Sequence, residues 1–138
     1  MDSLISPKLL KDAVFGLPEL HRENIAKASL VANPGCYSTA AVLALAPVVK
    51  EGLIYPDMVV DSKSGISGAG RTLSLATHYT EYTELNEDIC AYPLDGHRHL
   101  PEMEQELKSL SPSVSPSITF VPHLVPMTRG ILTTAMPN

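Results

Sequence analysis

Hydrophobic residues recur along the chain with two periods, one typical of helices and one typical of strands. Pro18 and Pro101 each stand in the first turn of a helical stretch, where proline's missing N–H costs little. Pro47 lies inside another helical stretch, which it should kink or interrupt because it cannot donate a helical hydrogen bond. The helical patterns cover residues 8–14, 18–27, 38–51 and 100–110, and the strand patterns cover 28–32, 57–65, 117–126 and 129–136.

This succession of elements predicts an α+β fold, with a mixed or antiparallel sheet covered by helices. The strands late in the chain are expected to be antiparallel. The run ASLVA, residues 28–32, is expected to be a buried strand.

The composition is that of an ordinary globular protein. The chain has 138 residues, 44% hydrophobic and 18% charged, which is enough for one domain and one core. A net charge of −5 gives no support for a nucleic-acid or anionic-membrane partner, and the longest apolar run, residues 40–49, is too short to span a bilayer. Two cysteines make no disulfide framework and no signal-peptide pattern opens the chain, so a cytoplasmic location is expected.

The stretch ANPGCYST places Cys36 directly after an Asn-Pro-Gly turn and before a helical pattern. The positive end of a helix dipole favours thiolate over thiol, which makes Cys36 a candidate nucleophile. Gly35 allows a tight turn and the close approach of a substrate. The alternative is a small buried apolar residue, which is also our interpretation of Cys90, because no such turn precedes it.

Two histidines alternate in the stretch DGHRHLPE, just before the helix expected at 100–110. Histidine exchanges protons near neutral pH, so His97 and His99 are candidates for general acid/base catalysis. A metal site is disfavoured, because His-x-His with one distant cysteine lacks a zinc-ligand spacing. Ordinary surface or core histidines remain the alternative.

A glycine-rich loop, GISGAGRT at 65–72, follows the strand expected at 57–65. It misses the phosphate-loop motif because Arg71 stands where lysine is required. Its glycines should still leave backbone N–H groups free to hold an anion, with Arg71 adding charge, unless the loop is simply a flexible turn. Arg129 is a second group able to bind a carboxylate or phosphate.

Together these residues supply a thiol, an imidazole and two anion-binding groups, a set that suits acyl transfer from a phosphorylated or otherwise activated acid. Two rival interpretations stay open. A Cys-His acyl hydrolase would share the nucleophile and base but use water as its second substrate. A non-catalytic remnant or assembly module would use neither.

Four blocks of sequence resemble the N-acetyl-gamma-glutamyl-phosphate reductases of arginine biosynthesis, in the same order and over almost the whole chain. The resemblance implies the substrate-domain fold shared with glyceraldehyde-3-phosphate dehydrogenase and aspartate-semialdehyde dehydrogenase. The blocks are FGLPELHRENIAKASLVANPGCYSTAAVLAL, SGISGAGR, AYPLDGHRHLPEMEQEL and FVPHLVPMTRGIL.

The resemblance also implies an NADP-dependent mechanism. Cys36 would attack the acyl phosphate of N-acetyl-glutamyl 5-phosphate, phosphate would leave, and NADPH would reduce the resulting thioester to the semialdehyde. His97 would serve as the acid/base. The matching positions place Arg71, Arg129 and His99 near the substrate, and Ser67 and Gly68 near the cofactor.

Members of this family open with a dinucleotide-binding domain whose glycine-rich turn has no counterpart in this sequence. Residues 1–33 are therefore expected to be the tail end of that domain, and residues 34–138 the catalytic or substrate domain, incomplete at its C-terminal end. We expect this chain alone not to bind NADP(H) tightly and not to turn over. Its expected partners are a small-molecule substrate and the missing domain of the same polypeptide. An exposed sheet edge leaves a homo-oligomer open.

Overall fold

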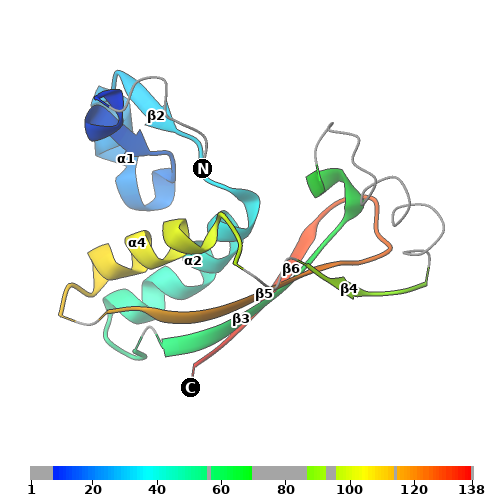
Figure 1. The fold of residues 1–138 in the computed structure, drawn as a ribbon. Helices are drawn as coiled ribbons and strands as arrows, with labels where there is room; N and C mark the ends of the chain where they lie inside the picture. The colour runs from blue at the N-terminus through cyan, green and yellow to red at the C-terminus, as the bar shows by residue number, and fades with distance from the viewer. Residues whose placement is uncertain (1–7, 56, 70–86, 93–95, 114, 138) are drawn as a thin grey trace. The chain divides into compact units, whose positions relative to one another are not determined.

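The computed structural model describes residues 8–55, 57–69, 87–92, 96–113 and 115–137. The chain divides into two compact units, Met1–Gly35 and Cys36–Asn138, each described by itself below (Figure 1). Cys36 is therefore the first residue of the second unit. Arg71, one of the expected substrate-binding residues, lies outside the described residues.

The first unit contains a short parallel pair of strands, β1 (Ala13–Phe15) and β2 (Leu30–Ala32). The helix predicted over residues 8–14 is wrong beyond Asp12, because only the 3-10 turn η1 (Leu9–Asp12) forms and the backbone then pairs with β2. Helix α1 (Pro18–Lys27) connects the strands and begins at its proline, as expected.

The prediction that residues 28–32 form a buried strand is also wrong. All of β2 is exposed, with Leu30 at 40% and Val31 at 44% of their full accessibility. A sheet of two short strands cannot cover its own apolar side chains. The apolar run thus identified a strand but not its burial.

The second unit is built on a four-stranded sheet in the order β4-β5-β3-β6. Strand β3 is central; it pairs in parallel with β5 and antiparallel with β6, while β4 is antiparallel to β5. The mixed sheet agrees with the predicted α+β class, but the expected antiparallel orientation is wrong for β5 against β3. The chain crosses over through a helix between these two strands, and such a crossover returns the second strand parallel to the first. The strands are β3 (Asp57–Ser64), β4 (Cys90–Ala91), β5 (Ser117–Leu124) and β6 (Ile131–Pro137).

Helices α2 (Cys36–Lys50) and α4 (Leu100–Leu110) lie side by side along one face of this sheet (Figure 1). Helix α2 buries a stripe at every fourth residue, which is the spacing that keeps side chains on one face of a helix. Alternate residues of β3 and β5 point toward the helices and complete the core. The core residues are Tyr37, Ala41, Leu45, Val49, Met58, Val60, Met103, Leu107 and Ile118.

Helix α2 continues past Pro47, so the interruption that the sequence allowed as one of two outcomes does not occur. Proline at this position leaves the carbonyl of Leu43 without its helical donor. Both Pro47 and Leu43 are exposed, so water can reach this side of the helix. The cost of the missing hydrogen bond is therefore smaller than it would be on the core side.

The opposite face of the sheet carries the other alternate residues of β3, namely Val59, Asp61 and Lys63. On β6 the matching positions Leu132 and Met136 are 63% and 48% exposed. Within the described residues both long helices of this unit pack on the other side. None of the helices that the structure describes is long and apolar enough to cross a membrane.

Candidate active site

Cys36 is the first residue of α2 and its thiol is exposed. It opens onto a cavity of about 210 Å³ formed where α2, the end of β3 and the start of β6 meet. The helix dipole places its positive end at this cysteine. The cavity is lined by Cys36, Ser64, Ser67, Gly68, Gly130 and Ile131.

The floor of the cavity is a loop held by the connection between β5 and β6. The amides of Gly65, Ile66 and Ser67 donate to the carbonyls of residues 130, 127 and 128, at 2.9, 2.9 and 3.1 Å. A Cβ at Gly65 would lie 2.8 Å from the backbone nitrogen of Arg129, so only glycine permits this approach. Gly130 has a φ of +105°, which also favours glycine.

These hydrogen bonds contradict one expectation about the glycine-rich loop. Its amides at residues 65–68 are not free to hold an anion, because each already donates to a backbone carbonyl. The amide of Gly68 donates to Gly65 at 3.2 Å within the 3-10 turn η2 (Ile66–Ala69). The side that this loop presents to the cavity consists instead of Ser67 and Gly68.

His97, which lies just before α4, belongs to a cluster of aromatic and imidazole rings. Its ring centroid is 5.4 Å from Tyr37, 4.6 Å from His99 and 5.4 Å from Phe120, each in an edge-to-face arrangement. Tyr37 directly follows Cys36 on α2, so the histidine contacts the residue next to the candidate nucleophile. His97 does not line the cavity itself.

A backbone contact defines which nitrogen of His97 carries its proton. The amide of His99 donates to His97 Nδ1 over 3.1 Å. Burial, followed by the neighbouring His99 and Arg98, lowers the pKa of His97 below its usual value. At neutral pH the ring is therefore uncharged, with its proton on Nε2, and it can donate a hydrogen bond from that atom.

His99 is the more buried of the two histidines, at 7% exposure. Burial lowers its pKa, and the carboxylate of Glu102 opposes this effect. Glu102 accepts a hydrogen bond of 2.5 Å from Ser38, so it joins the first turn of α4 to the first turn of α2. This bond ties the histidine-bearing end of α4 to the helix that begins at Cys36.

The structure thus places the predicted site residues in two groups. Cys36, Ser67 and Gly68 share the cavity, while His97 and His99 are in ring contact with each other. Arg129 is exposed and does not line the cavity; it lies between Thr128 and Gly130, whose carbonyls accept hydrogen bonds from the glycine loop. The interpretation of Cys90 as a packing residue is wrong, because β4 is an edge strand of two residues and leaves the thiol exposed.

Sequence reasoning missed Tyr37, Ser64 and Glu102. Tyr37 is 2% exposed, and its hydroxyl lies 3.0 Å from the hydroxyl of Tyr92, which is 55 positions away. Ser38 and Glu102 are 64 positions apart. No local pattern reports contacts at such separations, although a tyrosine directly after the cysteine was a usable signal.

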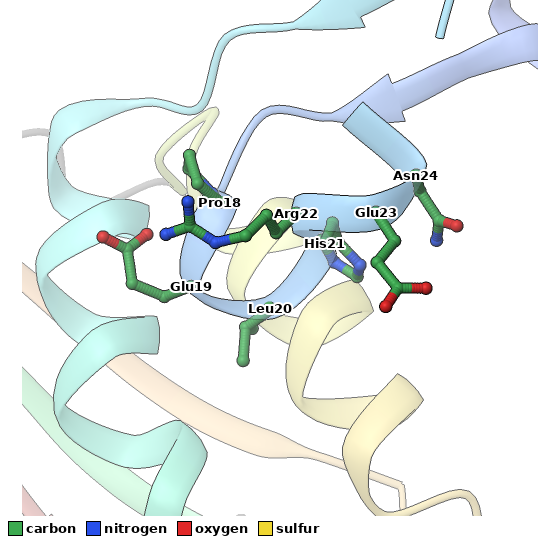
Figure 2. A pocket seen from close by; sticks show the side chains of 7 residues that line it. All are labelled: Pro18, Glu19, Leu20, His21, Arg22, Glu23 and Asn24. Carbon is green, nitrogen blue, oxygen red and sulfur yellow. The ribbon is translucent and has the colours of Figure 1, made fainter. Parts of the chain in front are cut away.

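A larger hollow, of about 410 Å³, follows helix α1 in the first unit. Its lining is the seven consecutive residues 18–24, and the helix departs from helical geometry at His21. Figure 2 shows Glu19 and Arg22 on one side of this stretch and His21, Glu23 and Asn24 on the other. Binding sites need polar groups that converge on one point, so this hollow is not our candidate.

Comparison with known proteins identifies relatives for nearly the whole chain. The family described as "Semialdehyde dehydrogenase, dimerisation domain" matches residues 36–138. Proteins named N-acetyl-gamma-glutamyl-phosphate reductase are similar, with 57% identity in Dehalococcoides mccartyi, 55% in Syntrophobacter fumaroxidans and 54% in Heliobacterium modesticaldum. Each match covers 94% of this chain and 37% of the relative, so the chain spans little more than a third of their length.

A solved structure has a similar fold. The crystal structure of aspartate semialdehyde dehydrogenase II from Vibrio cholerae matches with a TM-score of 0.66. The match covers 91% of this chain and 44% of that protein, at 17% sequence identity. This likeness confirms the predicted fold and carries no statement about chemistry.

Proposed function

Because the chain belongs to the semialdehyde dehydrogenase family through its dimerisation domain, we propose that it carries the nucleophile of an acyl-phosphate reductase. The substrate we infer is N-acetyl-glutamyl 5-phosphate, since the relatives at 53–57% identity are named for its reduction. The observation that carries the proposal is Cys36 at the first residue of α2, facing a cavity.

The first step is an acyl transfer. The Cys36 thiolate attacks the carbonyl carbon of the acyl phosphate, a carbon–sulfur bond forms, and the carbon–oxygen bond to the phosphoryl group breaks. Phosphate leaves with the bonding electron pair, and the acyl group remains on Cys36 as a thioester. The positive end of the α2 dipole stabilises the thiolate and the charge that develops on the carbonyl oxygen.

His97 would act from Nε2. With Nδ1 occupied by the His99 amide, the neutral ring donates from Nε2 to the developing oxyanion or to the leaving phosphate. His99 and Arg129 are the residues that we assign to the substrate's charged groups, together with Arg71. Ser67 and Gly68, which line the cavity with Cys36, would lie beside the reacting carbonyl and the reactive end of the cofactor.

The size of the cavity supports binding of the acyl end of the substrate and does not support binding of a whole dinucleotide. The cavity of about 210 Å³ is smaller than the ~300–1,000 Å³ typical of pockets for larger ligands. The amides at 65–68 are occupied and cannot bind a pyrophosphate. NADP(H), which supplies the hydride for such a reduction, would be held by a dinucleotide-binding domain of the same polypeptide.

Protection of Cys36 from alkylation tests the proposal. N-acetyl-glutamyl 5-phosphate should slow the iodoacetamide labelling of Cys36, whereas N-acetyl-glutamate with inorganic phosphate should protect far less. Labelling of Cys90 serves as the internal control and should not respond. Equal labelling of Cys36 with and without the acyl phosphate would contradict the proposal, and so would low-micromolar binding of NADPH to this chain in a calorimetric titration.

The rival acyl hydrolase predicts a different outcome with the same substrate. A hydrolase would return Cys36 to the free thiol by water attack and would release N-acetyl-glutamate continuously. A reductase domain without hydride should release one equivalent of phosphate and then stop. Phosphate release measured against time separates a single burst from steady turnover.

We also propose that a second copy of this chain covers the face of the four-stranded sheet that lies opposite α2 and α4. The matching family is described as a dimerisation domain, and the face exposes Leu132 and Met136. Polar groups lie among them, with His123 Nδ1 3.0 Å from Asp61 Oδ1 and Lys63 paired with Asp61. An apolar surface with scattered polar groups is typical of subunit interfaces.

A further inference from the structure

Tyr37, the second residue of α2, connects this helix to the end of strand β5. Its hydroxyl lies 3.0 Å from the hydroxyl of Tyr92 and 3.4 Å from the carbonyl oxygen of His123 on β5. Tyr92 is in turn fixed by its amide, which donates to the carbonyl of Pro122 at 2.9 Å. The phenol is therefore tethered to two neighbouring segments of backbone.

The ring of Tyr37 packs against the ring of His97. The two rings meet edge to face, at 5.4 Å between centroids and 87° between planes. Phe120 meets the Tyr37 ring at 5.3 Å and the His97 ring at 5.4 Å. Among the rings of described residues that contact His97, only that of Tyr37 belongs to the helix that begins with Cys36.

The hydroxyl of Tyr37 stays protonated at pH values around neutral, so its hydrogen bonds persist there. Burial, with a further contribution from Tyr92, raises the pKa of Tyr37 well above its usual value. The phenol consequently stays neutral and keeps the proton that it donates. A neutral, tethered ring can fix a neighbouring group without exchanging protons with it.

We propose that Tyr37 is a positioning residue that sets the orientation of His97 relative to Cys36. The Tyr37 ring limits tilting of the imidazole, while the His99 amide at Nδ1 limits its rotation and leaves Nε2–H as the donor. This role rests on the proposed function, in which His97 donates to the carbonyl oxygen or the leaving phosphate. Tyr37 itself does not contact the reacting atoms.

The first test measures the titration of His97 by NMR in Tyr37→Phe, which keeps the ring but removes the tether. Loss of the tether should let water reach the imidazole, so the His97 midpoint should rise by about half a pH unit toward its ordinary value. Tyr55→Phe, at a tyrosine that is 75% exposed, is the matched control and should not move it. His97→Gln identifies the resonance.

A purely structural role would lower the melting temperature of Tyr37→Phe without moving the His97 midpoint, and that result would overturn the proposal. Tyr92→Phe removes the other hydroxyl of the tether and should shift His97 in the same direction. If Tyr37→Phe does not fold, the Tyr92→Phe titration decides, and an unshifted midpoint there would refute the role.

Acyl transfer provides a separate measurement. The rate of transfer from N-acetyl-glutamyl 5-phosphate to Cys36 should fall about tenfold in Tyr37→Phe, because a misplaced donor loses most of its effect. An unchanged rate with a shifted His97 midpoint would also count against the role. If the unsubstituted chain transfers no acyl group, the proposed function fails, while the NMR titration still tests the orientation of His97.

Discussion

At the scale of single residues, the two cysteines differ in electrostatic setting and not in access. Both thiols are exposed, but only Cys36 begins a helix, whereas Cys90 lies on a strand of two residues. The sequence predicted this difference because Asn-Pro-Gly followed by a helical pattern is a local signal. It could not predict Tyr37 as a positioning residue, because the partners of its hydroxyl lie 55 and 86 positions away.

Cys36 should therefore react with iodoacetamide faster than Cys90. A helix end stabilises a charge by about 0.5–1 kcal/mol, which corresponds to a rate ratio of about two- to fivefold at neutral pH. Peptide mass mapping after brief labelling measures both sites in one sample. Equal rates, or faster labelling of Cys90, would contradict the role of the helix start.

The two histidines should make stability depend on pH. The pKa values of both histidines are lowered in the folded state, whereas in the unfolded chain they are about 6.5. At pH values between the folded and the unfolded pKa, the unfolded chain therefore binds more protons than the folded chain. The free energy of unfolding should rise with pH across this window and then level off. His97→Gln and His99→Gln should each flatten the rise, and their combination should flatten it further, in urea unfolding at a series of pH values. An unchanged slope in the double variant would refute this account.

At the scale of elements, the sequence predicted most accurately those segments whose end signals are local. Helix α4 runs over Leu100–Leu110, as Pro101 and the apolar spacing indicated. The segment 8–14 was mispredicted because pairing with β2 overrides its weak helical pattern. The occupied amides of Gly65, Ile66 and Ser67 were unpredictable, since their acceptors belong to the connection between β5 and β6, more than sixty positions later.

The substitution Gly65→Ala tests whether close packing of the glycine loop against the connection between β5 and β6 shapes the cavity. The added methyl group would lie 2.8 Å from backbone atoms of residues 127 and 129, which cannot move as a side chain can. Unfolding should become easier by about 1–3 kcal/mol, and the labelling rate of Cys36 should change as the loop moves. Gly52→Ala, strained only by its φ of +67°, is the control, because it should cost stability without altering Cys36.

At the scale of the whole molecule, the α+β class followed from the order of the elements, but strand orientation did not. Strand β5 lies parallel to β3 because the chain between them crosses over through α4. The exposure of β2 could not be predicted either, since burial depends on what covers a strand and not on its own sequence. Likewise, which face of the large sheet the described helices leave exposed follows only from the packing of α2 and α4.

If a second copy covers that face, Leu132→Asp and Met136→Asp should shift the chain from dimer to monomer, because each would bury an unpaired charge. Sedimentation equilibrium over a range of concentrations measures the dissociation constant, which should rise at least about tenfold. Leu53→Asp, at a 71% exposed residue in the turn after α2, should leave it unchanged. A chain that is monomeric throughout, or variants that dimerise normally, would refute this interface.

The most direct test of the central claim is the mass of Cys36 after exposure to its proposed substrate. Incubation with N-acetyl-glutamyl 5-phosphate, without any reductant, should add one N-acetyl-glutamyl group to the peptide that contains Cys36, and hydroxylamine should remove it as expected of a thioester. Cys36→Ser should prevent the modification, and Cys90→Ser should not. An unmodified Cys36, or acylation that persists in Cys36→Ser, would contradict the account.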